Sequence, residues 1–241
     1  MILTVVIGNT NTRLAWFEAG RKVRRRVART SVSGAALASI SPLPPLAVAS
    51  VVPALVPAIR RLAPATWTFV LDRSSRTGLK YRYSRPQVGA DRICDVVGAR
   101  TLLRGDLMVI DFGTAITLNV LTSKDEFLGG PILPGPDLML ASLSRGTARL
   151  PRVELTRPKA VLPKDTRSAI QSGVYHLLAF GIREMVRHIG SETGLRFKLI
   201  ATGGAAELLA PAIPGLTRIE PDLASIGLAE LARLNRPDWF K

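Results

Sequence analysis

Several residue types are scarce in this chain of 241 residues, and each scarcity excludes a class of protein. A single cysteine, Cys94, rules out a disulfide framework and a cysteine-rich zinc site. The two histidines rule out a histidine-cluster metal centre. Aromatic residues make up only 5% of the chain, so a nucleic-acid site would have few rings on which to stack bases.

Long uninterrupted apolar runs are also missing. The most apolar stretch, residues 43–59, contains Pro44, Pro45, Pro53 and Pro57, whereas a membrane-spanning helix needs about 18–20 apolar residues and seldom carries four prolines. The first residues show neither a basic segment nor a small-residue cleavage site, so no signal peptide is indicated. We therefore expect a soluble, cytoplasmic protein without a membrane segment. With 47% hydrophobic residues it can bury a core, and its length predicts one to two domains.

Acidic residues are scarce in the first 105 residues, which carry most of the net charge of +15. The extreme is Arg21–Arg29, in which six of nine residues are basic. Such a run suits a phosphate-rich partner, either a nucleic acid or a nucleotide. It is more often a solvated strand or turn face. No helix-turn-helix, zinc-finger or RNP signature is visible, so nucleic acid remains an alternative partner that we do not favour.

The order of apolar segments predicts an α/β architecture that is duplicated. In each half a strand ends at a glycine turn, further strands follow, and helices come next. This pattern predicts two domains, residues 1–105 and 106–241. Strands are expected at 2–7, 12–18, 21–29, 46–52, 67–71, 107–110, 115–122, 126–131 and 198–201, and the principal helices at 88–104, 136–145, 167–190 and 222–234.

Three glycine turns follow apolar strands, and each is a candidate phosphate site. They are Gly8–Thr12, Gly113–Ala115 and Thr202–Ala206. Glycine allows backbone N–H groups to approach a phosphate without a Cβ in the way. Single turns of this kind are usually only tight turns, but three in this order are less expected by chance. The P-loop and Rossmann fingerprints are absent from the sequence.

A fourth candidate is Asp91, in the first turn of the helix expected at 88–104. The positive end of the helix dipole and the neighbouring Arg92 both favour its ionised form. Taken alone, Asp91 is interpreted as a helix cap, which is the commoner role of aspartate there.

At this point the sequence resembles a known family, the type III pantothenate kinases of the acetate and sugar kinase/Hsc70/actin superfamily. The most family-specific stretch contains Gly89-Ala90-Asp91-Arg92, within YSRPQVGADR. The other matching stretches run nearly from end to end: GNTNT (8–12), SVVP (50–53), DFGTAITLN (111–119), FLGGPILPG (127–135), LPRVEL (150–155), DT and QSG within 165–173, and ATGG (201–204).

The resemblance implies two RNase H-like (actin-like ATPase) domains with an interdomain cleft that holds ATP. It also implies phosphorylation of pantothenate to 4′-phosphopantothenate, the first step of coenzyme A biosynthesis. The expected cofactors are ATP, Mg²⁺ and a monovalent cation, K⁺ or NH₄⁺, and the expected assembly is a homodimer.

The resemblance also assigns site residues, each by its position in this sequence. Asp91 is expected to be the catalytic base, and Asp111 to bind the monovalent cation. Arg92 is suited to a bidentate pair with the substrate carboxylate. The ATP and phosphate residues that carry over are Gly8, Asn9, Thr10, Gly113, Thr114, Gly203 and Gly204. The neighbouring Asn11, Thr12 and Arg13 are further candidates for the same site, Arg13 because its charge would partly neutralise the phosphates. The pantothenate residues are expected to be Tyr83, Gly89, Ala90, Asp91, Arg92 and Thr166, with the pocket completed across the dimer interface.

One departure from the family pattern concerns the metal. The family's first motif reads Asp-x-Gly-Asn-Thr, and Val6 stands where that aspartate would hold hydrated Mg²⁺. Three explanations remain open: a slow kinase, a kinase with another metal ligand such as Asp111, or an impaired kinase kept for another role. The last defines the alternative function, a regulatory protein resembling transcriptional accessory factors that uses the basic run Arg21–Arg29.

Overall fold

The structure is a computed structural model that describes residues 1–18 and 20–240. The chain divides into two compact units. Unit 1 comprises residues 1–104, 124–128 and 222–241, and unit 2 comprises residues 105–123 and 129–221. Among the described residues, no helix combines the length and the apolar character that a membrane crossing requires.

Unit 1 is built on a five-stranded sheet with the strand order β3-β2-β1-β4-β5. The strands β1, β2 and β3 form an antiparallel meander, whereas β4 runs parallel to both β1 and β5. A short parallel pair, β6 with β9, lies outside this sheet. The elements of unit 1 are β1 (Ile2–Ile7), β2 (Asn11–Glu18), β3 (Arg21–Arg29), α1 (Ser33–Ala38), β4 (Leu46–Ser50), α2 (Val56–Arg60), β5 (Thr68–Val70), β6 (Lys80–Tyr81), α3 (Ala90–Leu102), β9 (Glu126–Gly129) and α7 (Leu223–Asn235).

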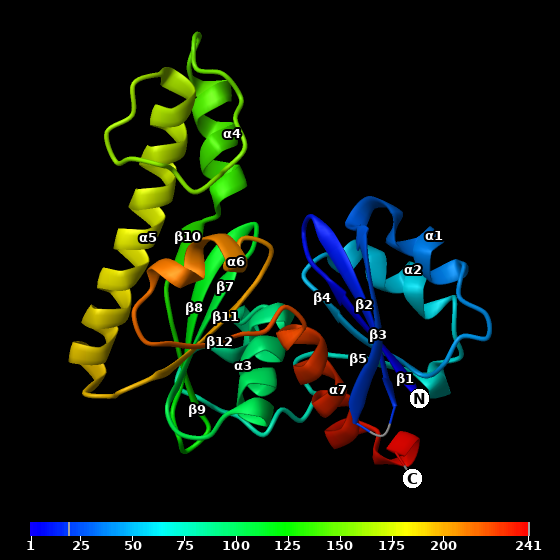
Figure 1. The fold of residues 1–241 in the computed structure, drawn as a ribbon. Helices are drawn as coiled ribbons and strands as arrows, with labels where there is room; N and C mark the ends of the chain where they lie inside the picture. The colour runs from blue at the N-terminus through cyan, green and yellow to red at the C-terminus, as the bar shows by residue number, and fades with distance from the viewer. Residues whose placement is uncertain (19, 241) are drawn as a thin grey trace. The chain divides into compact units, whose positions relative to one another are not determined.

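The two faces of this sheet are covered by different helices. Alternate residues of each strand point to opposite faces, which gives two separate apolar clusters. One cluster joins Val6, Ala15 and Phe17 to residues of α3 and α7. The other joins Val5 and Leu14, among others, to residues of α1 and α2, and Figure 1 shows α1 and α2 beside one another. The α3 face is the one that matters for the candidate site, because α3 carries Asp91.

Two glycines allow α3 and α7 to cross in close contact. A Cβ at Gly98 would lie 2.3 Å from the carbonyl oxygen of Leu223, and a Cβ at Gly227 would lie 1.8 Å from that of Cys94. Both distances are shorter than any real Cβ contact, so the crossing requires glycine at both positions. The depth at which α3 packs in unit 1 therefore depends on α7.

This packing also explains how the compact units differ from the predicted domains. The predicted boundary between residues 105 and 106 separates two domains, and it stays a prediction. The compact units follow it at residue 104, but the C-terminal residues 222–241 belong to unit 1. The reason is that α7 contacts α3, β1 and β4 of that unit. Residues 124–128 join unit 1 as well, through the pairing of β9 with β6.

Unit 2 repeats the strand pattern of unit 1. Its strand order includes β12-β11-β7-β8, and β10 also pairs with β8. As with β1 and β2, β7 and β8 are antiparallel, and β11 runs parallel to both β7 and β12. The long helices α4 and α5 lie side by side (Figure 1). The elements of unit 2 are β7 (Leu107–Phe112), β8 (Ala115–Leu121), β10 (Ile132–Pro134), α4 (Pro136–Gly146), α5 (Thr166–Thr193), β11 (Lys198–Thr202), α6 (Ala206–Leu209) and β12 (Leu216–Ile219).

The predicted α/β class and its duplication are therefore confirmed. The sequence did not predict α1, β6, β10 or β12, which are short. A strand of two to four residues offers few alternations, and β5 and β9 were predicted only because each lies within a longer apolar run.

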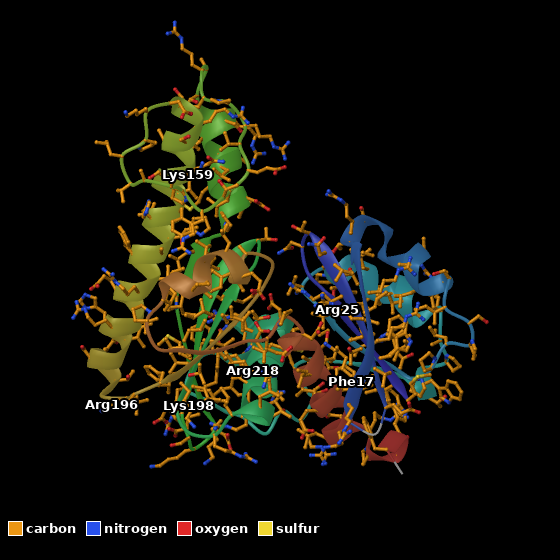
Figure 2. The ribbon with its side chains drawn as sticks, viewed as in Figure 1. Phe17, Arg25, Lys159, Arg196, Lys198 and Arg218 are labelled. Atoms are coloured by element: carbon orange, nitrogen blue, oxygen red, sulfur yellow. The ribbon has the colours of Figure 1, made fainter. Side chains whose placement is uncertain are left out.

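The basic run is strand β3, and the strand divides its cations between two faces. Arg24 lies over the ring of Trp16, 5.0 Å from its centroid, and Arg26 donates to the Ser39 hydroxyl. Lys22 and Arg25 instead pair with Asp222, which immediately precedes α7. Figure 2 shows Arg25 on β3 of unit 1. The six cations therefore do not form one continuous basic face.

Candidate functional site

The first glycine turn joins β1 to β2 in unit 1. The N–H of Gly8 donates to the carbonyl of Asn11 at 3.0 Å, which closes the turn. Asn9, Thr10 and Asn11 are exposed, so their polar groups can reach a ligand. The hydroxyl of Thr12 is buried and lies 3.3 Å from that of Thr30, so this side chain supports the turn from behind.

Thr30 is a supporting residue that the sequence analysis missed. Its hydroxyl donates to the carbonyl of Gly8 at 2.7 Å, and its N–H donates to the carbonyl of Thr10 at 2.9 Å. Both bonds fix the backbone of the turn from the end of β3. Nothing local in the sequence marks Thr30, because it lies 22 residues beyond Gly8.

Val6 and Arg13 lie opposite each other at the entrance to this turn. They are register partners in the antiparallel pair of β1 and β2, so their side chains share one face of the sheet. Val6 is 3% exposed and packs with Ile93 and Cys94 of α3. Arg13 is half-buried. The α3 face of the sheet thus presents an aliphatic side chain and a cation next to the turn.

Asp91 lies in the first turn of α3, which faces the same side of the sheet. The N–H of Arg92 donates to the Asp91 carboxylate at 2.8 Å. A Cβ on Gly89 would lie 2.4 Å from the same carboxylate oxygen, so glycine leaves the space that the carboxylate occupies. Burial raises the pKa of Asp91 above its ordinary value, against the opposing effects of the Arg92 N–H and the charges of Arg92 and Arg13. A carboxyl with a raised pKa is a stronger base once ionised.

Arg92 is enclosed by aromatic rings. Its side chain is 4% exposed, and its guanidinium lies 5.7 Å from the ring centroid of Tyr83 and 5.6 Å from that of Phe127. The two rings meet edge to face. Burial lowers the pKa of Arg92, while Tyr83 and the carboxylates of Asp91 and Asp95 oppose the change. The guanidinium is therefore held rigidly beside Asp91, under two rings.

Phe127 and Asp95 were not predicted as residues of this site. Phe127 is separated from Tyr83 by 44 residues and comes beside it through the pairing of β6 with β9. Asp95 lies one helical turn beyond Asp91 and is 2% exposed. Its position four residues after Asp91 was the available signal, because residues four apart share a helix face.

In unit 2, the second and third glycine turns meet at Asp111. Asp111 pairs in register with Thr202 of β11, which brings the end of β11 beside that of β7. A Cβ on Gly203 would lie 2.3 Å from a carboxylate oxygen of Asp111, and a Cβ on Gly113 would lie 3.3 Å from the other. Gly203 also has a positive φ of 94°. Glycine is required there by both space and backbone conformation.

The glycines at and near these two turns differ in how much space surrounds them. Gly135 was not predicted as a site residue, yet a Cβ there would lie 2.4 Å from the carbonyl oxygen of Thr114. Its N–H donates to that carbonyl at 2.9 Å. Gly204, which was predicted, has open space around it. The helix after it, α6, has four residues, too few for a strong helix dipole.

Thr166 is the first residue of α5 in unit 2 and is exposed. The carboxylate of Asp165 caps this helix by accepting from the Ser168 N–H at 3.0 Å. The N-terminus of α5 therefore presents the Thr166 hydroxyl to its surroundings.

Carboxylates are sparse around these turns. Within residues 1–18 and 20–240, no three His, Cys, Asp or Glu side chains gather in a group that could hold a metal ion. A cation at one of these turns would therefore be bound by at most two such side chains, together with hydroxyl, amide or backbone oxygens.

The family model and the curated relatives that match this chain agree on one family. The family model for type III pantothenate kinase matches residues 2–188. A type III pantothenate kinase of Parafrankia sp. is 36% identical over 242 residues, which cover 95% of this chain and 96% of that protein. One from Rhodospirillum rubrum is 36% identical over 257 residues, covering 99% and 100%.

Solved structures agree on the fold. A Campylobacter jejuni protein named for the Baf family of transcriptional activators superposes with a TM-score of 0.69 at 21% identity, covering 98% of this chain and 99% of that one. An activator of 2-hydroxyisocaproyl-CoA dehydratase from Clostridium difficile, with bound ADPNP, gives a TM-score of 0.54 at 10% identity, covering 98% and 96%. Together with the repeated strand order, these likenesses identify the two units as duplicated RNase H-like domains.

Proposed function

Because the chain belongs to the type III pantothenate kinase family, we propose that it phosphorylates pantothenate with ATP, the first step of coenzyme A biosynthesis. The observation that carries the proposal is the pair Asp91 and Arg92 at the start of α3. A half-buried carboxylate with a raised pKa lies there beside a guanidinium held under Tyr83 and Phe127. This arrangement suits the deprotonation of an alcohol next to an anionic substrate.

In the proposed reaction, the primary hydroxyl oxygen of pantothenate attacks the γ-phosphorus of ATP. A new P–O bond forms, the bond between the γ-phosphorus and the bridging oxygen breaks, and ADP leaves. The hydroxyl proton passes to the carboxylate of Asp91. Phosphoryl transfer of this kind depends mainly on positioning and on charge stabilisation. Arg92, beside Asp91, is proposed to pair with the carboxylate of pantothenate.

The glycine turns have separate proposed roles. The turn Gly8–Asn11 of unit 1 and the residues Gly113 and Thr114 of unit 2 are proposed contacts of the ATP phosphates. Gly203 and Gly204 are proposed to face the nucleoside. These assignments are supported by the exposed polar groups of the first turn and by the close backbone approaches in unit 2.

Asp111 fits the proposed monovalent cation. Its carboxylate lies against two glycines, and a hard oxygen ligand of this kind suits K⁺. A cation bound there would supply positive charge near the phosphates. Thr166 is proposed to complete the pantothenate pocket from a second copy of the chain.

The experiment is an assay of pantothenate phosphorylation by the purified chain with ATP and Mg²⁺, with and without K⁺. The proposal expects turnover that K⁺ stimulates, and loss of turnover by a factor of about 10²–10⁴ in Asp91→Asn. Unchanged turnover in Asp91→Asn would overturn the role of Asp91. A wild-type chain without turnover, together with an active Val6→Asp variant, would indicate a kinase scaffold disabled at its metal site and would favour the regulatory alternative.

A further inference from the structure

Arg13 lies on β2 just past the first glycine turn, where it is expected near the nucleotide phosphates. Its guanidinium makes no hydrogen bond or ion pair with any residue in the described part of the chain. It projects from the second strand of the first glycine turn, on the face shared by Val6 and α3. It is close enough to Asp91 to stabilise the negative charge of that carboxylate. A half-buried cation in this position is available to a ligand bound at the turn.

The surroundings of Arg13 do not fit a divalent metal ion held by β1. Mg²⁺ in nucleotide sites is usually held by one or two carboxylates together with the phosphates. Here the side chain opposite Arg13 is Val6, which is buried among aliphatic residues. The exposed groups of the turn, Asn9, Thr10 and Asn11, are neutral. A cation next to the turn would also repel a divalent ion placed beside it.

Building on the proposed function, we propose that Arg13 takes the place of a carboxylate-bound Mg²⁺ as the counter-charge for the nucleotide phosphates in unit 1. Guanidinium groups bind phosphate oxygens through two parallel hydrogen bonds, and they remain charged throughout the pH range of proteins. The aliphatic Val6 opposite adds no second carboxylate that would compete for the guanidinium. The protein would therefore bind a nucleoside triphosphate without a divalent ion, in a manner that depends on Arg13.

The test measures binding rather than turnover. Binding of the non-hydrolysable analogue ADPNP to the full chain is followed by calorimetry, once with excess EDTA and once with Mg²⁺. Wild type should bind in EDTA, and Arg13→Met should weaken that binding by about tenfold or more, the loss expected for a charge-assisted hydrogen bond. Arg13→Lys keeps the charge and should retain part of the affinity.

Arg26→Met is the matched control. Arg26 lies one register position away, opposite Leu14, on the other face of the sheet, and donates to Ser39. The same change of charge there should leave the binding of ADPNP unaltered. Thermal unfolding of each variant shows whether it is folded.

A double variant gives the sharpest outcome. Val6→Asp alone places a carboxylate opposite Arg13, which should neutralise the guanidinium and weaken binding in EDTA. Val6→Asp combined with Arg13→Val should bind ADPNP only when Mg²⁺ is present.

Equal affinity of wild type and folded Arg13→Met in EDTA would overturn the inference, as would binding by wild type that requires Mg²⁺. Either result leaves the proposed kinase reaction standing, whereas a wild type that binds no nucleotide in either condition overturns both.

Discussion

At the scale of single residues, the chemistry of the site follows from what surrounds Asp91. The side chain lies in a helix first turn, where the dipole and the Arg92 N–H favour the carboxylate form. Burial opposes these effects and outweighs them, so the pKa is raised. A base whose pKa lies nearer the working pH is better matched to proton transfer.

The raised pKa of Asp91 predicts a pH dependence of activity. Only the ionised carboxylate can accept a proton, so kcat/KM should fall on the acid side. The fall should occur at a pH above 3.8, the ordinary value for an aspartate. The measurement is the pH profile of kcat/KM between pH 4 and 8. An acid limb that is absent, or that lies below the ordinary aspartate range, would contradict the assignment.

The same shift predicts the effect of Asp91→Asn on stability. The folded-state pKa lies above the unfolded one, so the contribution of Asp91 to stability is full at low pH and is lost as the pH rises through the folded value. At neutral pH the ionised, half-buried carboxylate therefore disfavours the fold. Asp91→Asn should unfold at the same or a higher temperature than wild type at pH 7.5, which separates lost activity from lost folding.

At the scale of elements, the position of α3 is set by a helix that lies more than 100 residues away in the chain. The N-terminal turn of α3 carries Asp91 and Arg92, and its middle crosses α7 at Gly98 and Gly227. A displacement of α3 would move the carboxylate relative to the glycine turn of β1 and β2. The crossing is thus part of what positions Asp91, the proposed base.

Gly227→Ala should therefore destabilise the protein and reduce turnover. The added methyl group meets the carbonyl of Cys94, and overpacking of this kind costs about 1–3 kcal/mol. Chemical denaturation and the pantothenate assay measure the two effects. Gly173→Ala in α5 is the control, since a Cβ there meets open space and alanine is the better helix former. It should raise the free energy of unfolding by about 0.5–1 kcal/mol, and a loss of stability like that of Gly227→Ala would argue against the crossing as the cause.

At the scale of the whole molecule, the charge on β3 bears on nucleic-acid binding, whereas the exposed apolar surface bears on assembly. The cations of β3 are divided by the strand alternation, with Arg24 and Arg26 on one face and Lys22 and Arg25 engaged by Asp222 on the other. This division weakens the case for a nucleic-acid surface on the run 21–29. The alternative regulatory function remains a hypothesis without a continuous basic face to support it.

The expected homodimer has a testable surface on α5. Leu177 and Phe180 are 62% and 49% exposed and lie three residues apart, on one face of the helix. Leu177→Glu should convert a dimer to a monomer in sedimentation experiments, while the melting of the single chain changes little. Leu62→Glu, an exposed leucine of unit 1, is the control and should leave the assembly unchanged. A wild type that sediments as a monomer would contradict the expectation of a dimer.

Much of this protein was determined by the sequence alone. Apolar runs that end at glycine turns fixed the α/β class and the duplication, because strand burial and turn conformation are local properties. The stretch Gly89–Arg92 identified the candidate base, and Val6 identified the missing acid. Short strands such as β10 and β12 were not predicted, because local patterning cannot detect pairing that depends on a distant partner.

Only the tertiary structure decided which side chains meet. Sheet register placed Arg13 opposite Val6, and strand pairing brought Phe127 over Arg92. The end of β3 brought Thr30 behind the first glycine turn, and the parallel pairing of β7 and β11 brought Gly203 against Asp111. Burial, which raises the pKa of Asp91, is likewise a property of packing. Each of these depends on contacts between residues far apart in the chain, and no local pattern encodes such contacts.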